Sequence, residues 1–547
     1  MEKCKQIHLE KPNTLEKFLS EKERMGIESL KITGVIGRKD FDKVLDGMCE
    51  VWGKYDDEDE DEFTPDYESA AALKCLDMGE ATYVDGDGLP YFGFHTQLET
   101  CILPKGIKTT IDGVDTETGL SESGKLKTLV LPKGLKTVAG FQSCPNLTDL
   151  VLPDGLEEIK SFAFSGCEAI TRMCIPASVK EMDGSCFADC NIAAFEVDEN
   201  NPYFTVIDGV IYNKDLTTLV AFPSAYPNKH FVIPQNVKVI GDCAFMDSRI
   251  DTIELPEGLT TIEGWAFDGS EIRSIELPDS VTSIGELAFR FCFNLEKVKL
   301  SNGLTQIPEQ TFSSCSNLKT LEIPSSVKTI QYSALLWCEN IELLILHDGL
   351  EEIVSEGVPL RRKGHLREVV FPKTLKKVPG GVFNNSPFYK AFKLDPENPY
   401  FSVIDGALCS KDGKILYSVP DYSRSSFSVP EGVEVIAEQA FAFLPNLRTI
   451  KLPSTLKEIK TRAFQGEGKA CSLKQIQIPA GVEKIEFLAF WNDKLKTIIM
   501  EGPVPPKIVG YDNDGWIYND VELRVPKDAV EKYKKYAGWR CFKIKGV

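Results

Sequence analysis

A repeat of 21 to 23 residues runs through most of the sequence and limits the folds open to it. The segment LPDSVTSIGELAFRFCFNLEKVKL runs from Leu277 to Leu300, and SNGLTQIPEQTFSSCSNLKTLEIP follows it with the same spacing of apolar residues. A proline after an apolar-x-apolar triplet marks the repeat, at Pro104, Pro132, Pro153, Pro176, Pro234, Pro256, Pro278, Pro324, Pro372, Pro430, Pro453 and Pro479, with Ser301 and His347 at equivalent places. Self-similarity at such a fixed period is the signature of a stacked repeat architecture.

Two further residue types recur in phase with the proline. A phenylalanine, usually preceded by alanine, occupies one slot at Phe164, Phe187, Phe245, Phe267, Phe289, Phe312, Phe441, Phe464 and Phe490. A cysteine occurs three residues beyond the aromatic slot at Cys144, Cys167, Cys190, Cys292, Cys315 and Cys338. Each unit therefore has a fixed order of apolar positions, while its charged residues vary freely.

The order of apolar positions predicts the local structure of one unit. Alternation at Leu318, Leu321 and Ile323 favours a strand with one buried face, and the following proline ends it because proline cannot donate to a ladder. The segment from Val281 to Ile284 predicts a second short strand, and the Ala-Phe segment predicts a single helical turn. One such unit cannot bury its own apolar edge, so the units must stack. We expect an α/β solenoid of about fifteen rungs, spaced roughly 4.8 Å apart around a parallel sheet.

Two insertions interrupt the period in the same way. The markers Pro176 and Pro234 are 58 residues apart, and so are Pro372 and Pro430. The gaps contain the related segments NNPYFTVIDGVIYNKDLTTLVAFP and ENPYFSVIDGALCSKDGKILYSVP, so we expect β-hairpin inserts near residues 198–231 and 395–427. Turn residues at 213–215 and 411–413 mark the hairpins. Duplication of a whole block of rungs is the simplest origin of the pair.

The two ends of the solenoid require caps because each end exposes an apolar edge. We assign residues 97–500 to the repeats, residues 1–96 to an N-terminal capping domain and residues 501–547 to a C-terminal cap. The first domain is predicted to contain a helix after Thr14, a strand at IESLKITG and a helix at DFDKVLDGM. Its acidic run, 56–62, is predicted to be a loop; a calcium site there stays open, although the spacing matches no chelating loop.

A helix between Pro526 and Gly538 is predicted in the C-terminal cap. Val530, Tyr533 and Tyr536 fall at helical spacing, and we expect them to lie on the last rung.

The repeated LPxxVxxIxxxAFxxCxxLxxIxL units resemble the BspA-like leucine-rich repeats of bacterial proteins, as at 277–300 and 452–478. The resemblance covers roughly residues 97–500, and similar inserts and N-terminal regions occur in that family. It implies a curved, right-handed solenoid with a parallel sheet on the concave side. It also implies secretion or cell-surface display, with a role in adhesion or protein binding.

Charge and hydropathy exclude several partners. The formal net charge is −20, whereas phosphate binding needs a basic face, so nucleic acid and anionic lipid are not expected partners. No stretch approaches the roughly 20 apolar residues of a membrane span. The first residues lack an apolar run of signal length, which indicates either a cytoplasmic chain or one whose leader was removed.

Catalytic and metal-binding patterns are absent from the sequence. The five histidines are scattered without metal-ligand spacing, and the ladder cysteines are expected to act as small buried apolar residues. Cys186 and Cys190 have no second pair to complete a zinc site. No phosphate loop, nucleophile elbow or dinucleotide fingerprint occurs, so we expect no enzyme, no metal and no cofactor. Because scattered carboxylates cannot be paired from sequence, a glycan-processing enzyme stays open as a minor alternative.

One residue of each strand, between two buried ones, is predicted to face the concave side. These residues are Ile102, Val130, Val151, Cys174, Glu254, Glu276, Lys299, Glu322, Ile345, Val370, Lys451 and Gln477. The apolar members near the N-terminus have two explanations. β-branched residues favour strands, or part of residues 1–96 or a partner covers the strip.

Two classes of function are consistent with the sequence. The first is a binding or adhesion protein, monomeric, that presents this extended surface to a protein or glycan ligand, with host molecules among the candidate ligands. The second is a structural surface protein without a specific ligand.

Overall fold

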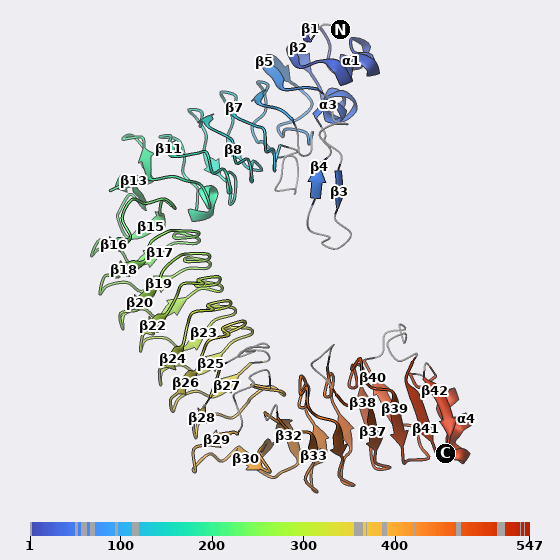
Figure 1. The fold of residues 1–547 in the computed structure, drawn as a ribbon. Helices are drawn as coiled ribbons and strands as arrows, with labels where there is room; N and C mark the ends of the chain where they lie inside the picture. The colour runs from blue at the N-terminus through green and yellow to red at the C-terminus, as the bar shows by residue number, and fades with distance from the viewer. Residues whose placement is uncertain are drawn as a thin grey trace. The chain divides into compact units, whose positions relative to one another are not determined.

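The computed structural model describes residues 3–49, 53–55, 63–65, 72–92, 97–111, 120–354, 365–367, 369–384, 391–420, 423–466, 472–510, 520–536, 538–540 and 542–547. The acidic run predicted at 56–62 lies outside these residues. The chain divides into an N-terminal unit, Met1–Ile272, and a C-terminal unit, Arg273–Val547. Figure 1 shows each unit as a series of successive coils. The predicted parallel solenoid is confirmed.

The apolar-x-apolar segments form parallel strands that pair from coil to coil, which we call the first ladder. In the N-terminal unit it comprises β1 (Cys4–Leu9), β2 (Ser29–Ile36), β5 (Cys75–Tyr83), β6 (Thr100–Ile102), β7 (Thr128–Val130) and β9 (Asp149–Val151) in one sheet, then the pairs β11 (Arg172–Ile175) with β12 (Ala194–Val197) and β16 (His230–Val232) with β18 (Thr252–Glu254).

The first ladder of the C-terminal unit follows the same plan. It pairs β20 (Ser274–Glu276) with β22 (Lys297–Lys299), β24 (Thr320–Ile323) with β26 (Leu343–Leu346), β28 (Val370–Phe371) with β29 (Lys393–Leu394), and β33 (Ser426–Ser428) with β35 (Thr449–Lys451). It ends in one sheet of β37 (Gln475–Ile478), β39 (Thr497–Met500), β41 (Glu522–Val525) and β42 (Lys543–Gly546).

A second ladder of short strands follows the proline turn in each coil. Its members in the N-terminal unit are β8 (Thr137–Val138), β10 (Glu158–Ile159), β17 (Val239–Ile240) and β19 (Thr261–Ile262). Those in the C-terminal unit are β21 (Ser283–Ile284), β23 (Gln306–Ile307), β25 (Thr329–Ile330), β27 (Glu352–Ile353), β34 (Val435–Ile436), β36 (Glu458–Ile459), β38 (Lys484–Glu486) and β40 (Lys507–Val509).

The Ala-Phe segment, predicted as a helical turn, forms instead a row of hydrogen-bonded turns between coils. In one coil Leu287 and Phe291, which flank the segment, adopt left-handed φ angles of 58° and 56°. Their amides donate to carbonyls of the next coil, as does that of Phe289, whose N–H lies 2.9 Å from the Thr311 carbonyl oxygen. In a helical turn these amides would point along the axis of the helix. The left-handed residues instead turn every second amide toward the neighbouring coil. One coil retains a 3-10 helix, η3 (Gly184–Phe187).

The phenylalanines of the repeat stack face to face inside each unit. Phe245 and Phe267 have ring centroids 4.8 Å apart and planes inclined by 6°, and Phe289 and Phe312 are 5.4 Å apart at 9°. Further stacked pairs are Phe141–Phe164, Phe164–Phe187, Phe441–Phe464 and Phe464–Phe490. These side chains are buried, so the stack forms the centre of the core.

The cysteine slot lies directly beside the phenylalanine stack. The Cys315 thiol donates to the Phe289 carbonyl oxygen of the preceding coil at 3.1 Å, and the Cys338 thiol donates to that of Phe312 at 2.9 Å. All six ladder cysteines are buried and free of disulfides. The slot therefore suits a small apolar side chain that also satisfies one backbone carbonyl, which alanine or valine cannot do.

Both predicted hairpin inserts are present as antiparallel strands. The first contains β13 (Phe204–Ile207), β14 (Val210–Asn213) and β15 (Thr218–Ala221), and the second contains β30 (Phe401–Ile404), β31 (Ala407–Ser410) and β32 (Ile415–Ser418). The third strand of each joins the second ladder, through β15 to β17 and β32 to β34.

One buried asparagine fixes the start of each insert in the same way. The Asn201 amide donates to the Pro176 and Val179 carbonyl oxygens at 2.8 and 3.0 Å. Asn398 makes the equivalent bonds to Pro372 and Leu375 at 2.8 and 3.3 Å. That both asparagines make the same hydrogen bonds supports duplication of a block of coils.

Coil stacking extends beyond the segment in which the proline marker occurs. Three strands of residues 1–96, β1, β2 and β5, join the sheet that contains β6 and β7, and β41 and β42 extend the ladder nearly to the C-terminus. The structure has about 21 turns rather than the expected fifteen. The marker missed the N-terminal coils because the strands β1, β2 and β5 alternate buried and exposed residues but are not immediately followed by a proline.

Among the described residues, the α-helices lie near the two ends of the chain. The N-terminal helices are η1 (Leu15–Lys17), α1 (Glu21–Gly26), α2 (Arg38–Asp40), η2 (Phe41–Leu45) and α3 (Asp46–Cys49), and a hairpin pairs β3 (Gly53–Tyr55) with β4 (Phe63–Pro65). At the C-terminus, η6 (Lys527–Ala529) leads into α4 (Val530–Lys535). Tyr533 is fully buried and donates to the Gly502 carbonyl oxygen at 2.9 Å, whereas Tyr536 is 39% exposed. Only part of the predicted helical face therefore packs on the last coils.

Replacing Phe289 by alanine should severely destabilise the C-terminal unit. The change removes a fully buried ring from the stack on Phe312, and Phe-to-Ala changes in a core cost about 3–5 kcal/mol. Glu276→Ala is the matched control, because that side chain is 79% exposed and its loss should cost less than about 0.5 kcal/mol. Two denaturant titrations suffice; equal losses of stability would contradict the stacking role.

The six ladder thiols should resist alkylation in the folded protein and react once denaturant is added, without any reductant. Burial raises the pKa of Cys190 to about 12 and raises that of Cys315 as well, so little reactive thiolate forms there. A hydrogen bond with the Cys167 thiol lowers the pKa of Cys144, so its protection rests on its complete burial, which all six share. The exposed Cys4 and Cys174 should react first. Peptide mapping after alkylation measures this, and a bridge linking Cys144, Cys167 or Cys190 would contradict it.

Candidate functional site

The residues predicted to face the concave side lie on the solvent-facing side of the first ladder, which we call the outward face. In the N-terminal unit, Ile102 pairs with Val130 and Val130 pairs with Val151 across three adjacent strands. Further along that unit, Cys174 pairs with Glu196, and Glu254 pairs with Val232. The alternation within each strand fixes this register, because the residues on either side point into the core.

The apolar row of the outward face is open to solvent. Val130 is 42% and Val151 is 80% exposed, and Val232, which the sequence interpretation did not include, is 50% exposed. The described part of residues 1–96 therefore does not cover Val130 and Val151, contrary to one of the two explanations. The strands β1, β2 and β5 lie edge to edge with β6 in the same sheet, so they extend the face instead of covering it.

The outward face of the C-terminal unit is mainly charged. Glu276 pairs with Lys299 across β20 and β22, with 3.7 Å between carboxylate and ammonium, and Glu322 pairs with Ile345 across β24 and β26. Val370, at 44% exposure, is an apolar position on β28. The structure thus places the predicted residues in rows within each unit, as adjacent surface positions.

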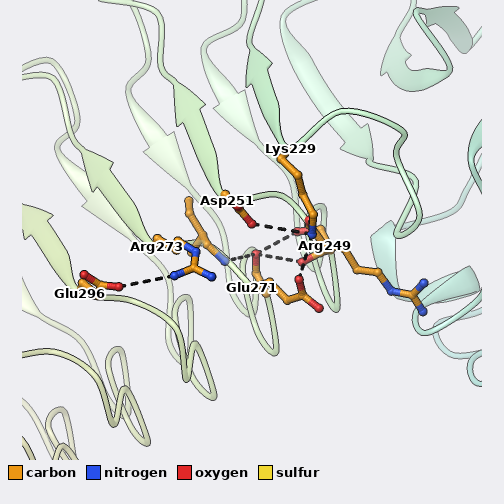
Figure 2. Close-up of polar contacts among 9 residues, drawn as sticks. Lys229, Arg249, Asp251, Glu271, Arg273 and Glu296 are labelled. Atoms are coloured by element: carbon orange, nitrogen blue, oxygen red, sulfur yellow. Dashed lines mark hydrogen bonds and ion pairs between the residues drawn. The ribbon is translucent and has the colours of Figure 1, made fainter.

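Charges of alternating sign border the first ladder. In the N-terminal unit, Lys229 Nζ lies 3.7 Å from Asp251 Oδ1 and 3.1 Å from Glu271 Oε2 (Figure 2). In the C-terminal unit, Arg273 pairs with Glu296 at 3.6 Å (Figure 2). Exposed ion pairs of this kind contribute little stability. Stacking nevertheless places equivalent residues of successive coils only about 4.8 Å apart, so like charges there would repel each other and disfavour this register of the strands. We assign this border a role in register rather than in binding.

A hollow of about 590 Å³ lies on the outward face of the C-terminal unit. It is lined by Glu431, Ile450, Lys451, Leu452, Ser454, Gln477, Pro479, Ala480, Gly481 and Glu501. Two of these, Lys451 and Gln477, were predicted from sequence as face residues. The other polar residues follow the ends of neighbouring strands and come from separate coils, so sequence spacing could not bring them together.

Hydrogen bonds orient most of the polar side chains in the hollow. The Ser454 hydroxyl donates to Glu431 at 3.1 Å, and the Ser454 amide donates to the same carboxylate at 3.3 Å. The Gln477 side-chain amide donates to Glu501. Across the described part of the chain, the Lys451 ammonium has no ion-pair or hydrogen-bond partner.

A second exposed group, which the sequence interpretation missed, lies on the Ala-Phe edge of the C-terminal unit. Phe291, Phe293, Tyr332 and Trp337 are 36–54% exposed, and Arg290 lies 4.7 Å from the centroid of the Phe291 ring. Phe291 and Trp337 have left-handed φ angles at a slot that also holds Phe443 and that holds serine, glycine or aspartate in several other coils. An aromatic residue in that slot was the available signal, because bulky side chains rarely adopt this conformation.

Metal-ligating side chains are not grouped in the described residues: no cluster of three His, Cys, Asp or Glu could hold a metal ion there. His347 Nε2 lies 2.7 Å from Glu322, and His230 Nδ1 lies 2.9 Å from Thr252 Oγ1, so both imidazoles have ordinary surface partners. Over the same residues, no helix has the length and apolar character needed to cross a bilayer.

Asp247 is a carboxyl group in the N-terminal unit whose surroundings disfavour its charged form. Burial, together with the nearby Asp189 and Asp268 carboxylates, raises the pKa of Asp247 to about 6. Gly269 allows this close packing, because a Cβ added there would lie 2.2 Å from Asp247 Oδ1. The folded state therefore holds this proton more tightly than the unfolded chain does.

Replacing Asp247 by asparagine should stabilise the protein near pH 7.5 and have little effect near pH 4. The raised pKa supplies stability below about pH 4 that is lost as the pH rises through about 6, and the loss amounts to at most about 2–3 kcal/mol. Asparagine stays neutral and tolerates the left-handed φ of 54° at this position. Thermal melts across pH measure the difference, with Asp215→Asn in an exposed turn as control. A pH-independent effect would contradict the assignment.

Comparison with known proteins identifies the repeats. The family model described as the BspA-type leucine-rich repeat region matches residues 96–214, 218–342, 272–390 and 420–505. No curated protein matches the chain.

Among solved structures, the chain is similar to a leucine-rich repeat protein of Eubacterium ventriosum, with 16% identity over 86% of this chain and 83% of that one, at a TM-score of 0.38. It is similar to one of Bacteroides ovatus, with 21% identity over 72% and 88% of the chains and a TM-score of 0.39. The family model covers more than half of the sequence, and its repeats coincide with the coils described above. The chain belongs to the BspA-type leucine-rich repeat family.

Proposed function

We propose that the protein is a non-enzymatic binding protein, which presents the outward face of the first ladder to a protein or glycan ligand. The observation that carries this proposal is the open apolar row in which Val130 and Val151 are adjacent and 42% and 80% exposed. Contiguous apolar residues exposed on a soluble protein often mark an interaction site. An adhesion role, with surface display and a ligand of host origin, is the expectation that accompanies this family.

The rigidity of the face also supports a binding role. Each strand is held by inter-coil hydrogen bonds and by the buried core beneath it, so the exposed side chains keep a fixed spacing. A rigid surface loses little conformational entropy when a partner binds.

The alternative of a structural surface protein makes a different prediction. Such a protein would associate with itself through the exposed rows and bind no other ligand. A binding protein would stay monomeric alone and form a saturable complex with a defined partner.

Replacing both Val130 and Val151 by lysine should weaken ligand binding at least about tenfold without unfolding the chain, since both side chains point to solvent. Biolayer interferometry against a panel of purified host matrix proteins and mucin glycans measures binding. Sedimentation velocity of the free protein measures self-association. Thr260→Lys, an exposed position outside this row, is the control and should bind like the wild type. Self-association without any saturable ligand, reversed by the two lysines, would support the structural alternative and overturn the proposal.

A further inference from the structure

We infer that the hollow beside Lys451 and Gln477 is a binding subsite for a neutral saccharide. The inference rests on the proposed function, because it names the ligand class for the outward face of the C-terminal unit. It depends on three properties of the hollow: its hydrogen-bonding groups, their orientation and its charge.

The hollow offers donors and acceptors side by side. The Lys451 ammonium can only donate, the Glu431 and Glu501 carboxylates can only accept, and the Gln477 amide does both. A sugar hydroxyl donates one hydrogen bond and accepts others at the same time. A surface with donors and acceptors interleaved over about 590 Å³ therefore matches a chain of hydroxyl groups, and its size is in the range of small-ligand sites.

The polar groups are oriented before any ligand binds. Two bonds from Ser454 fix Glu431, and the bond from Gln477 to Glu501 fixes both of those side chains. The Gln477 carbonyl oxygen and further carboxylate lone pairs stay available to a ligand. Lys451 is the unpaired donor that a hydroxyl group can satisfy. Such preorganisation reduces the entropy lost on binding.

Charge and lining disfavour other ligand classes. Two carboxylates and one ammonium give the lining a slight negative charge, which disfavours phosphate and other anions. None of the ten lining residues is aromatic; of the apolar ones, Ile450 and Leu452 are each only 7% exposed, and Pro479 and Ala480 are small. The hollow therefore lacks the deep apolar pocket that anchors a protein side chain at an interface.

The repeat does not demand this set of residues. Lys451 precedes Leu452-Pro453, and the residue that precedes the equivalent Leu255-Pro256 is Glu254. A solenoid therefore forms with the opposite charge at that position. The polar residues of the hollow are consequently a feature of this part of the surface.

Isothermal titration calorimetry of the full chain tests the inference, with cellotetraose, maltotetraose, laminaritetraose, xylotetraose and chitotetraose as probes. We expect saturable binding of at least one of them, with an affinity in the range of about 0.01–1 mM. Lys451→Met and Gln477→Ala should each weaken that binding about tenfold or more, because each removes hydrogen-bonding capacity from an exposed side chain. Lys494→Met, at an exposed lysine outside the hollow and outside the first ladder, is the matched control and should bind like the wild type.

Two results would overturn the inference: no saturable binding of any of the five saccharides, or binding that survives both hollow variants unchanged. Circular dichroism of each variant confirms that the loss is not due to unfolding. If a protein ligand binds and is lost in the Val130→Lys, Val151→Lys variant while no saccharide binds, the inference fails and the proposed function stands. If the chain binds neither kind of ligand and only self-associates, both fail.

Discussion

Stacking between coils is the interaction on which the whole structure depends. A single coil has one strand of three or four residues, one of two residues and one turn, and none of these is stable alone. Each becomes stable when the next coil supplies its hydrogen-bond partners and covers its apolar edge. The Phe245–Phe267 and Phe289–Phe312 stacks show this dependence inside the core. Each phenylalanine packs against the phenylalanine at the same position of the next coil, so the residue recurs in successive coils. The free energy of the fold is thus a sum over neighbouring coils.

This dependence explains why so much of the fold was predictable from the sequence. Because neighbouring coils must match, the sequence repeats its apolar positions in phase, and the period reports the strands, the proline turns and the cysteine slot directly. The hairpin inserts were predictable for the same reason: their turns at 213–215 and 411–413 interrupt the period and carry their own signals. Even the outward face followed from alternation, since Val130 and Val151 each have a buried neighbour in sequence.

The features that could not be predicted from the sequence also have physical causes. The coils of β1, β2 and β5 stack without the Leu-Pro pair, because hydrogen bonding of a strand does not require that particular turn. The Ala-Phe turns depend on residues with left-handed φ angles, such as Leu287 and Trp337. The sequence indicates this backbone conformation only where glycine or asparagine occupies the position. The hollow combines residues from 431 to 501 that lie on four successive coils, and only the curvature and side-chain directions of the folded chain reveal a concavity there.

The same constraint that fixes the interior leaves the exterior free to specialise. Interior slots are constrained from two sides by neighbouring coils, so a change at Phe289 propagates to its neighbours, whereas Lys451 or Glu254 can occupy one exterior slot with no effect on the stack. Function in such a chain must therefore reside in residues that the repeat leaves unconstrained and that differ from coil to coil. The open valine row and the polar hollow both meet that condition, and they differ in chemistry although they occupy the same kind of surface. A solenoid can in this way carry a different subsite in each of its units, each defined by only a few exposed side chains.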